Sequence, residues 1–189
     1  MNNSKWVYIK ELGIEVMDTH VNQEQYYSIT RKKPSYFKNK PNHPVEQVSY
    51  EDCLEFINIL NNNDSEYKYK LLSKEEYDYC CGNVDEQSVL DVAWCFENSK
   101  KSAQPTKTKQ PNNLGLYDML GNVWTITSEE MGSSLAVRGG SWYYNAKFCR
   151  SAQRCSVAPG KRYYFVGFRL ARILHFNTFN LEHLLSEDT

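Results

Sequence analysis

The chain has 189 residues, of which 41% are hydrophobic and 24% are charged, so it is long enough to bury one core and too apolar for a disordered protein. Its formal net charge is −1, with acidic and basic residues interspersed. This charge gives no basic field for a phosphate backbone and argues against nucleic acid as a partner. Because no apolar run approaches the roughly 20 residues that cross a bilayer, membrane insertion is not expected either.

Three capping motifs predict helices in the first half of the chain. Residues 22–25, 49–52 and 73–76 each place an Asn or Ser side chain three residues before Gln, Asp or Glu, a pattern that satisfies the free amides of a helix N-terminus. Apolar residues follow each motif at helical spacing. The residues expected to face inward are Tyr26 and Ile29 in the first helix, Tyr50, Cys53, Leu54, Ile57 and Leu60 in the second, and Tyr77 and Cys80 in the third.

The rest of the chain predicts short strands and irregular segments. The second helix should end in the asparagines at 61–63, and Gly82 should supply a left-handed C-cap for the third. Residues 69–72, 135–138 and 166–170 favour strands, whereas residues 99–110 are polar without periodicity and indicate a surface loop. Gly139 and Gly140 indicate a positive φ or a close backbone approach. Short helices together with short strands predict an α+β fold.

The last residues alternate loosely between apolar and polar side chains and end in acidic residues. Two interpretations remain open for residues 173–189: a helix packed on the domain or on a partner, or a frayed tail. We therefore predict one domain over residues 1–172 and a C-terminal extension over residues 173–189.

The chemistry of the cysteines depends on the compartment. The first residues lack the apolar core and the cleavage site of a secretory signal, so we expect a cytoplasmic protein, with surface display through a partner as an open alternative. In that compartment the six cysteines should stay reduced and mostly buried. None of them forms a C-x-x-C pair, so no zinc site is expected.

Several segments occur in the order typical of one known family. They are HPVEQVSY at 43–50, KLLSKEEYDY at 70–79, NLGLYDMLGNVW at 113–124, RGGSW at 138–142, RSAQR at 150–154 and GFR at 167–169. Together they resemble the formylglycine-generating enzyme and sulfatase-modifying-factor family over about residues 14–172. The resemblance implies a C-type-lectin-like α+β fold with short helices, small twisted antiparallel sheets and much irregular structure.

The resemblance also implies a copper site, and this sequence departs from it. In the family, two cysteines five residues apart, just after the Gly-Gly-Ser segment, hold Cu(I), a soft ion that requires thiolate ligands. Here the first position is Tyr144 and the second is Cys149, and a phenol is a hard, normally protonated group. Cys155 lies six residues further on and matches nothing in the family pattern. We therefore predict that the protein is not an enzyme and has no catalytic residue, bound metal or cofactor.

Other signs of enzyme or metal chemistry are weak. Thr125 stands where the family commonly has a glutamate, which weakens the case for the structural calcium site that the resemblance implies. His20, His43, His175 and His183 are scattered and form no H-x-x-x-H motif.

Aromatic residues gather instead between the framework segments at 141–142 and 167–169, and the mixture of Tyr and Phe with Ser, Asn and Gly is typical of binding loops. The arrangement is similar to the variable proteins of diversity-generating retroelements, which use the same fold and rewrite a C-terminal segment by mutating adenines of a template. Most of these residues have codons that differ from an Asn codon only at its two adenines, as mutation of template adenines would produce. Lys147 and Lys161 do not, and they require another template codon. The expected ligand-binding residues are Tyr143, Tyr144, Asn145, Lys147, Phe148, Cys155, Ser156, Val157, Lys161, Tyr163, Tyr164 and Phe165.

The predicted function is therefore a non-catalytic ligand-binding protein, of the retroelement-diversified type, whose surface at about 143–165 contacts a protein or other macromolecular ligand. One alternative is a copper-dependent oxidase of the formylglycine-generating type with an altered site. Another is a structural or regulatory pseudoenzyme whose residues 173–189 dock a partner. A structural interpretation also stays open, in which the aromatic side chains simply pack in the core.

Overall fold

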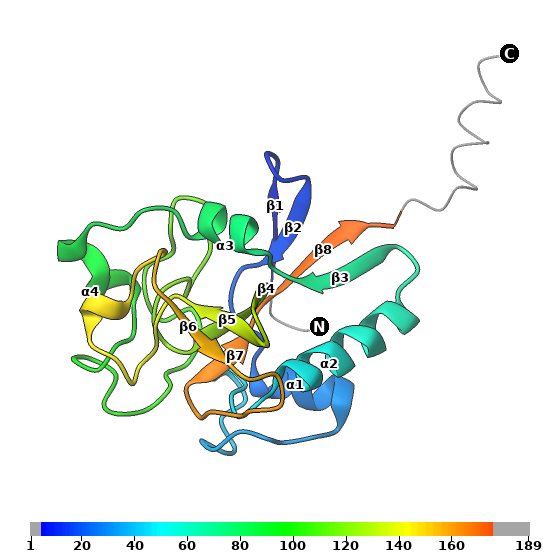
Figure 1. The fold of residues 1–189 in the computed structure, drawn as a ribbon, viewed down its shortest axis with the longest axis horizontal. Helices are drawn as coiled ribbons and strands as arrows, with labels where there is room; N and C mark the ends of the chain where they lie inside the picture. The colour runs from blue at the N-terminus through cyan, green and yellow to red at the C-terminus, as the bar shows by residue number, and fades with distance from the viewer. Residues whose placement is uncertain (1–4, 176–189) are drawn as a thin grey trace, which may run out of the picture.

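A computed structural model describes residues 5–175 of the protein, which fold into short helices around two small sheets (Figure 1). The predicted α+β class is confirmed. The strands are β1 (Trp6–Ile9), β2 (Ile14–Met17), β3 (Tyr67–Leu71), β4 (Trp124–Met131), β5 (Ser134–Arg138), β6 (Arg154–Val157), β7 (Val166–Phe168) and β8 (Leu170–Leu174). The α-helices are α1 (Gln23–Thr30), α2 (Tyr50–Asn63), α3 (Lys74–Cys81) and α4 (Val89–Val92), and the 3₁₀ turns are η1 (Glu86–Ser88) and η2 (Ala146–Phe148).

The last two strands of the described chain belong to different sheets, β7 to one and β8 to the other. One sheet has the order β1-β2-β8-β3 and is antiparallel throughout, so β8 lies between strands from the first half of the chain. The other has the order β6-β5-β4-β7, in which only β7 runs parallel to its neighbour, β4. Figure 1 shows α1 and α2 side by side below β3 and β8. The topology places β6 at an open edge of its sheet.

The three predicted capping boxes are confirmed. The side chains of Asn22, Ser49 and Ser73 each accept a hydrogen bond from the backbone amide of the third residue of the helix that follows. The side chain of that third residue in turn accepts one from the backbone amide of the cap residue. The predicted inward face of α2 is partly wrong, because Leu54 is exposed and Phe56 is buried in its place. Phe56 stacks on Tyr26 of α1 with ring centroids 5.5 Å apart, so contact between the helices sets this face.

The paired glycines behave as predicted. Gly139 and Gly140 have φ values of 91° and 79°, and a Cβ atom on either residue would lie within 3 Å of neighbouring atoms. Gly82 also has a positive φ, 64°, but its ψ of −170° is extended, so the predicted left-handed C-cap of α3 is wrong in ψ. The loop at 99–110 has no helix or strand, yet it buries Ser99 and Ala103 and is therefore not wholly a surface segment.

The described chain ends at His175. β8 continues to Leu174, two residues past the predicted domain boundary at 172, and residues 176–189 of the predicted extension lie outside the described residues. Within residues 5–175, every helix is too short or too polar to traverse a lipid bilayer.

Candidate functional site

The aromatic side chains that follow β5 and precede β7 form one network of contacting rings. Tyr143 stacks on Phe165 with centroids 5.3 Å apart, and Tyr163 stacks on the same ring at 5.4 Å. Tyr144 and Tyr164 each meet Phe165 edge to face. These are favourable geometries for aromatic pairs, so the structure brings together five of the predicted site residues from two segments.

The framework residues fix both segments by backbone hydrogen bonds. The Trp142 amide donates to the Asn122 carbonyl at 2.9 Å, and the Trp124 amide donates to the Phe165 carbonyl at 2.8 Å. The Gln47 amide donates to the Tyr163 carbonyl at 3.0 Å. These hydrogen bonds fix the main chain of both segments, so the positions of the rings are set by the fold.

The predicted site residues differ in their exposure. The exposed ones are Tyr143, Asn145, Lys147, Cys155, Ser156 and Lys161, and the half-buried ones are Tyr144, Phe148, Tyr163, Tyr164 and Phe165. Tyr144, Tyr163 and Phe165 also pack against the main core. Val157 is 8% exposed and belongs to that core, so this side chain does not join the surface. The aromatic residues thus combine surface exposure with packing.

The polar residues of the predicted set lie in the two segments that carry the rings and on β6. Asn145 donates from its side-chain amide to Glu97, which also accepts from the backbone amide of Ala146. The Lys147 ammonium lies 5.1 Å from the centre of the Phe148 ring. Cys155 and Ser156 lie on β6, the edge strand, and Lys161 closes a turn by donating from its amide to Ala158.

Sequence reasoning missed two aromatic contributors from the loop after α1. Tyr36 is 64% exposed, and its ring lies 5.5 Å from that of Tyr164. Phe37 meets the buried Trp142 ring edge to face at 5.5 Å. The neighbouring Tyr-Phe pair in a polar segment was a visible signal, but nothing local indicated that it meets residues more than 100 positions away. We call Tyr36, Tyr143 and Tyr164 with their supporting rings the aromatic surface.

Glu46 fixes the loop that carries Tyr36 and Phe37. Its buried carboxylate accepts hydrogen bonds from the backbone amides of both residues, each at 3.0 Å. Burial raises the pKa of Glu46 from 4.5 to about 7, against the opposing effect of these hydrogen bonds. The charged form is therefore disfavoured in the folded protein relative to the unfolded chain.

This raised pKa predicts a pH-dependent stability. Between about pH 4.5 and pH 7 the folded protein retains a proton on Glu46 that the unfolded chain releases, so stability should fall as the pH rises through this window, by about 3 kcal/mol in all. Above pH 7 this contribution should stay constant. Urea denaturation at several pH values measures it. Glu46→Gln should abolish this part of the slope, whereas an unchanged slope in the variant would assign it to other groups.

Tyr144 and Cys149, the two positions at which the resemblance implies copper ligands, lie in different surroundings. Tyr144 sets its ring edge to face against Trp124 at 5.7 Å, among Phe148 and Phe165. Cys149 is fully buried against Gly140, where a Cβ atom would lie 2.8 Å from its sulfur. A hydrogen bond with the Cys95 thiol raises the pKa of Cys149, and burial raises it further.

Cys95 is a neighbour of Cys149 that the sequence did not reveal. The same hydrogen bond lowers the pKa of Cys95, and the Phe96 amide donates to the Tyr144 carbonyl at 2.9 Å, which ties this loop to the site. Both thiols are buried, while Cys155 is the exposed cysteine. Among the described residues, no group of three or more His, Cys, Asp or Glu side chains is arranged to hold a metal ion.

Thr125, the position at which the resemblance implies a calcium-linked glutamate, forms a hydrogen bond between neutral groups. Thr125 lies 2.8 Å, oxygen to nitrogen, from the ring of the buried His20, whose pKa burial lowers well below 6.5. Nearby, the buried Asp118 accepts hydrogen bonds from Thr19 and from the Lys107 amide, each at 3.0 Å. The Lys107 ammonium also pairs with Asp18 at 2.6 Å. Protein donors thus hold these carboxylates, an arrangement that does not fit a hard cation.

The fold is similar to that of several solved structures. Treponema denticola variable protein 1 superposes with a TM-score of 0.76 at 20% identity, over 89% of this chain and 91% of that one. PvdO from Pseudomonas aeruginosa superposes with a TM-score of 0.74 at 23% identity, over 85% of this chain and 80% of that one. The predicted C-type-lectin-like fold of the formylglycine-generating-enzyme type is confirmed.

Sequence comparison finds the same kind of relatives. The formylglycine-generating enzyme of Thermomonospora curvata is 23% identical, over 77% of this chain and 61% of the relative. That of Mus musculus is 24% identical, over 70% of this chain and 45% of the relative, so the chain spans less than two thirds of the length of either enzyme. The sequence profile of the Sulfatase-modifying factor enzyme 1-like domain matches residues 7–174, and the chain belongs to this family.

Proposed function

We propose that the protein is a non-catalytic binding protein whose aromatic surface contacts a protein or other macromolecular ligand. The observation that carries the proposal is the position of Tyr143, which is 47% exposed while its ring contacts the rings of Trp142, Tyr144, Tyr164 and Phe165. An exposed aromatic ring that is already held by its neighbours loses little conformational entropy when it binds.

The surface also has the composition of a binding hot spot. Tyr36, Tyr143 and Tyr164 combine a large apolar area with a hydroxyl group that can exchange hydrogen bonds with a partner. Exposed Asn145 and Lys147, which follow Tyr144 in the chain, would supply polar contacts beside it. The deeper rings pack against the core, and the rings of Tyr143 and Tyr164 rest on one of them, Phe165.

Diversification by a retroelement would explain how the aromatic and polar residues are distributed along the chain. The aromatic and polar residues fall in two stretches separated by framework residues, of which Arg154 pairs with Glu129 at 3.4 Å. The similarity in fold to a variable protein of Treponema denticola is in keeping with this proposal. We expect a reverse-transcriptase gene beside the gene for this chain, with a near-copy of the segment encoding residues 141–169 that differs only at adenines. A near-copy with changes at all four bases would contradict diversification of this type.

The absence of catalysis is proposed from the chemistry of two residues. The family's Cu(I) site needs two thiolates, and Tyr144 offers a phenol whose pKa burial raises further. Cys149 has a raised pKa and is packed against the backbone of Gly140, so its thiol is disfavoured as a thiolate ligand. The alternative of an oxidase with an altered site finds no support in this pair.

Replacing Tyr143 with alanine should weaken binding at the aromatic surface. A phage-displayed random peptide library, selected on the immobilised protein, supplies defined probes, and their affinities can then be measured for purified variants. We expect Tyr143→Ala to weaken the selected peptides by at least about tenfold, because a preorganised aromatic ring at the centre of a binding site is a typical hot spot. Isothermal titration calorimetry measures the change.

Tyr8→Ala provides the matched control, because Tyr8 is 63% exposed but lies on β1, in the other sheet. This variant should bind the same peptides with unchanged affinity. Peptides that tolerate Tyr143→Ala, or that lose affinity equally with Tyr8→Ala, would contradict the proposed surface. Circular dichroism of both variants distinguishes a lost contact from a lost fold.

A further inference from the structure

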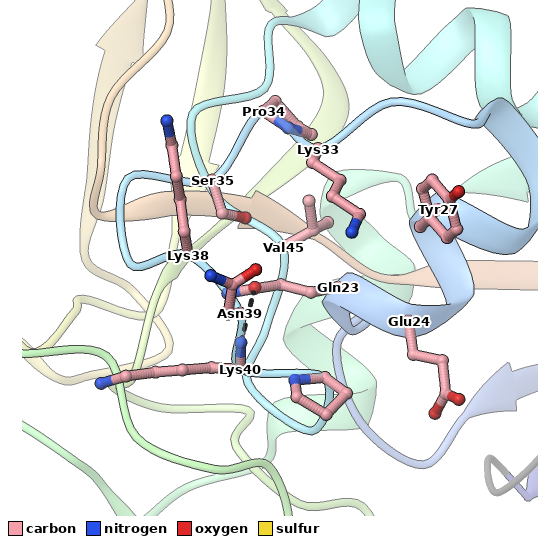
Figure 2. Close-up of a pocket in the computed structure, with 11 residues that line it drawn as sticks. Gln23, Glu24, Tyr27, Lys33, Pro34, Ser35, Lys38, Asn39, Lys40 and Val45 are labelled. Carbon is pink, nitrogen blue, oxygen red and sulfur yellow. Dashed lines mark hydrogen bonds between the residues drawn. The ribbon is translucent and has the colours of Figure 1, made fainter.

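A cavity separate from the aromatic surface lies beside the loop that carries Tyr36 and Phe37. Helix α1 and the segment from residue 33 to residue 45 enclose a cavity of about 230 Å³ (Figure 2). The apolar part of its lining comes from Tyr27, Pro34, Pro41 and Val45. This volume is below the roughly 300–1,000 Å³ of pockets for drug-sized molecules, so the cavity suits a compound about as large as one aromatic side chain.

Hydrogen bonds hold the walls of this cavity in place. Gln23 bridges the loop, since its side chain donates to the Phe37 carbonyl at 2.9 Å and accepts from the Lys40 amide at 3.3 Å. The Glu24 amide donates to the Pro41 carbonyl at 3.2 Å. On the other side of the loop, Glu46 holds the amides of residues 36 and 37. The cavity is therefore formed before any ligand arrives, which lowers the entropic cost of binding.

The charge at the cavity is positive. The Lys33 ammonium lies 4.7 Å from the centre of the Tyr27 ring, and the Arg31 guanidinium lies 5.8 Å from the same ring. Figure 2 shows Lys33 and Asn39 turned toward the space between the loop and α1, whereas Glu24, Lys38 and Lys40 extend away from it. Within residues 5–175, Lys33 has no carboxylate at salt-bridge distance, so its charge is available to a ligand.

We propose that this cavity binds a small carboxylate with an aromatic or branched aliphatic body. The apolar body would lie between the Tyr27 ring and the two prolines, where its apolar surface would be removed from water. The carboxylate would pair with Lys33 at the mouth, where a hydrogen bond between charged groups is stronger than one between neutral groups. Asn39 would donate a second hydrogen bond from its side-chain amide. An ammonium ligand would meet Lys33 as a like charge.

Titration of the ¹⁵N-labelled protein with benzoate tests this site. We expect amide resonances of Ser35, Asn39 and Val45 to shift, with a dissociation constant of about 1–10 mM, the range that compounds of this size reach. Benzamide has the same shape without the charge and should bind at least about tenfold more weakly, and benzylamine should leave these resonances unchanged. Equal binding of benzoate and benzamide, or shifts confined to other regions, would overturn the proposal.

Two lysine variants separate the proposed contact from general electrostatics. Lys33→Met keeps the apolar stem and should weaken benzoate by about tenfold, whereas Lys68→Met removes an exposed charge on β3 and should leave the affinity unchanged. Equal loss in both variants would contradict a specific carboxylate site. Tyr143→Ala should bind benzoate as well as the wild type does, so this test succeeds or fails independently of the aromatic surface.

Discussion

Gly139→Ala is expected to destabilise the protein by about 4 kcal/mol or more, from backbone strain and overpacking together. Gly139 has a φ of 91°, and a Cβ atom there would lie 2.2 Å from the Tyr77 hydroxyl oxygen and 2.5 Å from the Met119 carbonyl oxygen. These two atoms are themselves joined by a buried hydrogen bond. Because the carbonyl belongs to the backbone of the core, the clash requires a shift of packed structure or the loss of that bond, in addition to backbone strain.

Gly132→Ala is the matched control for this prediction. Gly132 also has a positive φ, 64°, but a Cβ atom there would meet nothing within 4 Å. Only the strain of a left-handed conformation remains, which costs about 1–2 kcal/mol. Urea denaturation of the two variants compares them directly. If Gly139→Ala proved no more destabilising than Gly132→Ala, the close packing at the paired glycines would be refuted.

Arg169→Leu is expected to cost about 3–5 kcal/mol of stability. Arg169 is completely buried between β7 and β8 and donates hydrogen bonds to the carbonyls of Met17 and Tyr117. Its charge also faces the buried Asp118. The leucine variant leaves two carbonyls without this donor and a buried carboxyl without a nearby cation, and each loss carries a desolvation cost.

Arg162→Leu tests whether this effect belongs to burial. Arg162 pairs with Asp52 at 2.7 Å, but its side chain is 53% exposed. Removal of an exposed ion pair should change stability by no more than about 1 kcal/mol. Thermal denaturation of both variants gives the comparison, and a similar loss in both would show that Arg169 contributes no more than a surface arginine.

Those elements of the fold that depend on local chemistry could be predicted from the sequence. Asn22, Ser49 and Ser73 cap their helices through residues only three positions away, so the sequence contains all the partners. The buried face of α2 was harder to predict from the sequence, because Phe56 turns inward to meet Tyr26 of another helix. Gly82 shows the same limit, since its ψ depends on where the chain goes after α3.

The candidate site could be predicted only in part, for a similar reason. The aromatic composition of residues 143–165 indicated a cluster, and the structure brings these rings together. Val157 was misplaced because β6 pairs with β5 and sets its position opposite Leu135, which turns it into the core. Tyr36 and Cys95 enter the site from loops far away in the sequence, so no spacing rule could have found them.

We propose that this chain uses the region around Tyr144 and Cys149 for binding and not for metal chemistry. Anaerobic titration with Cu(I) against a chromogenic chelator tests it, with Cys149→Ser and Cys95→Ser as companions to the wild type. The proposal predicts no stoichiometric uptake and the same curve for all three proteins. One tightly bound Cu(I) per chain, lost when Cys149 or its neighbour Cys95 becomes serine, would contradict it.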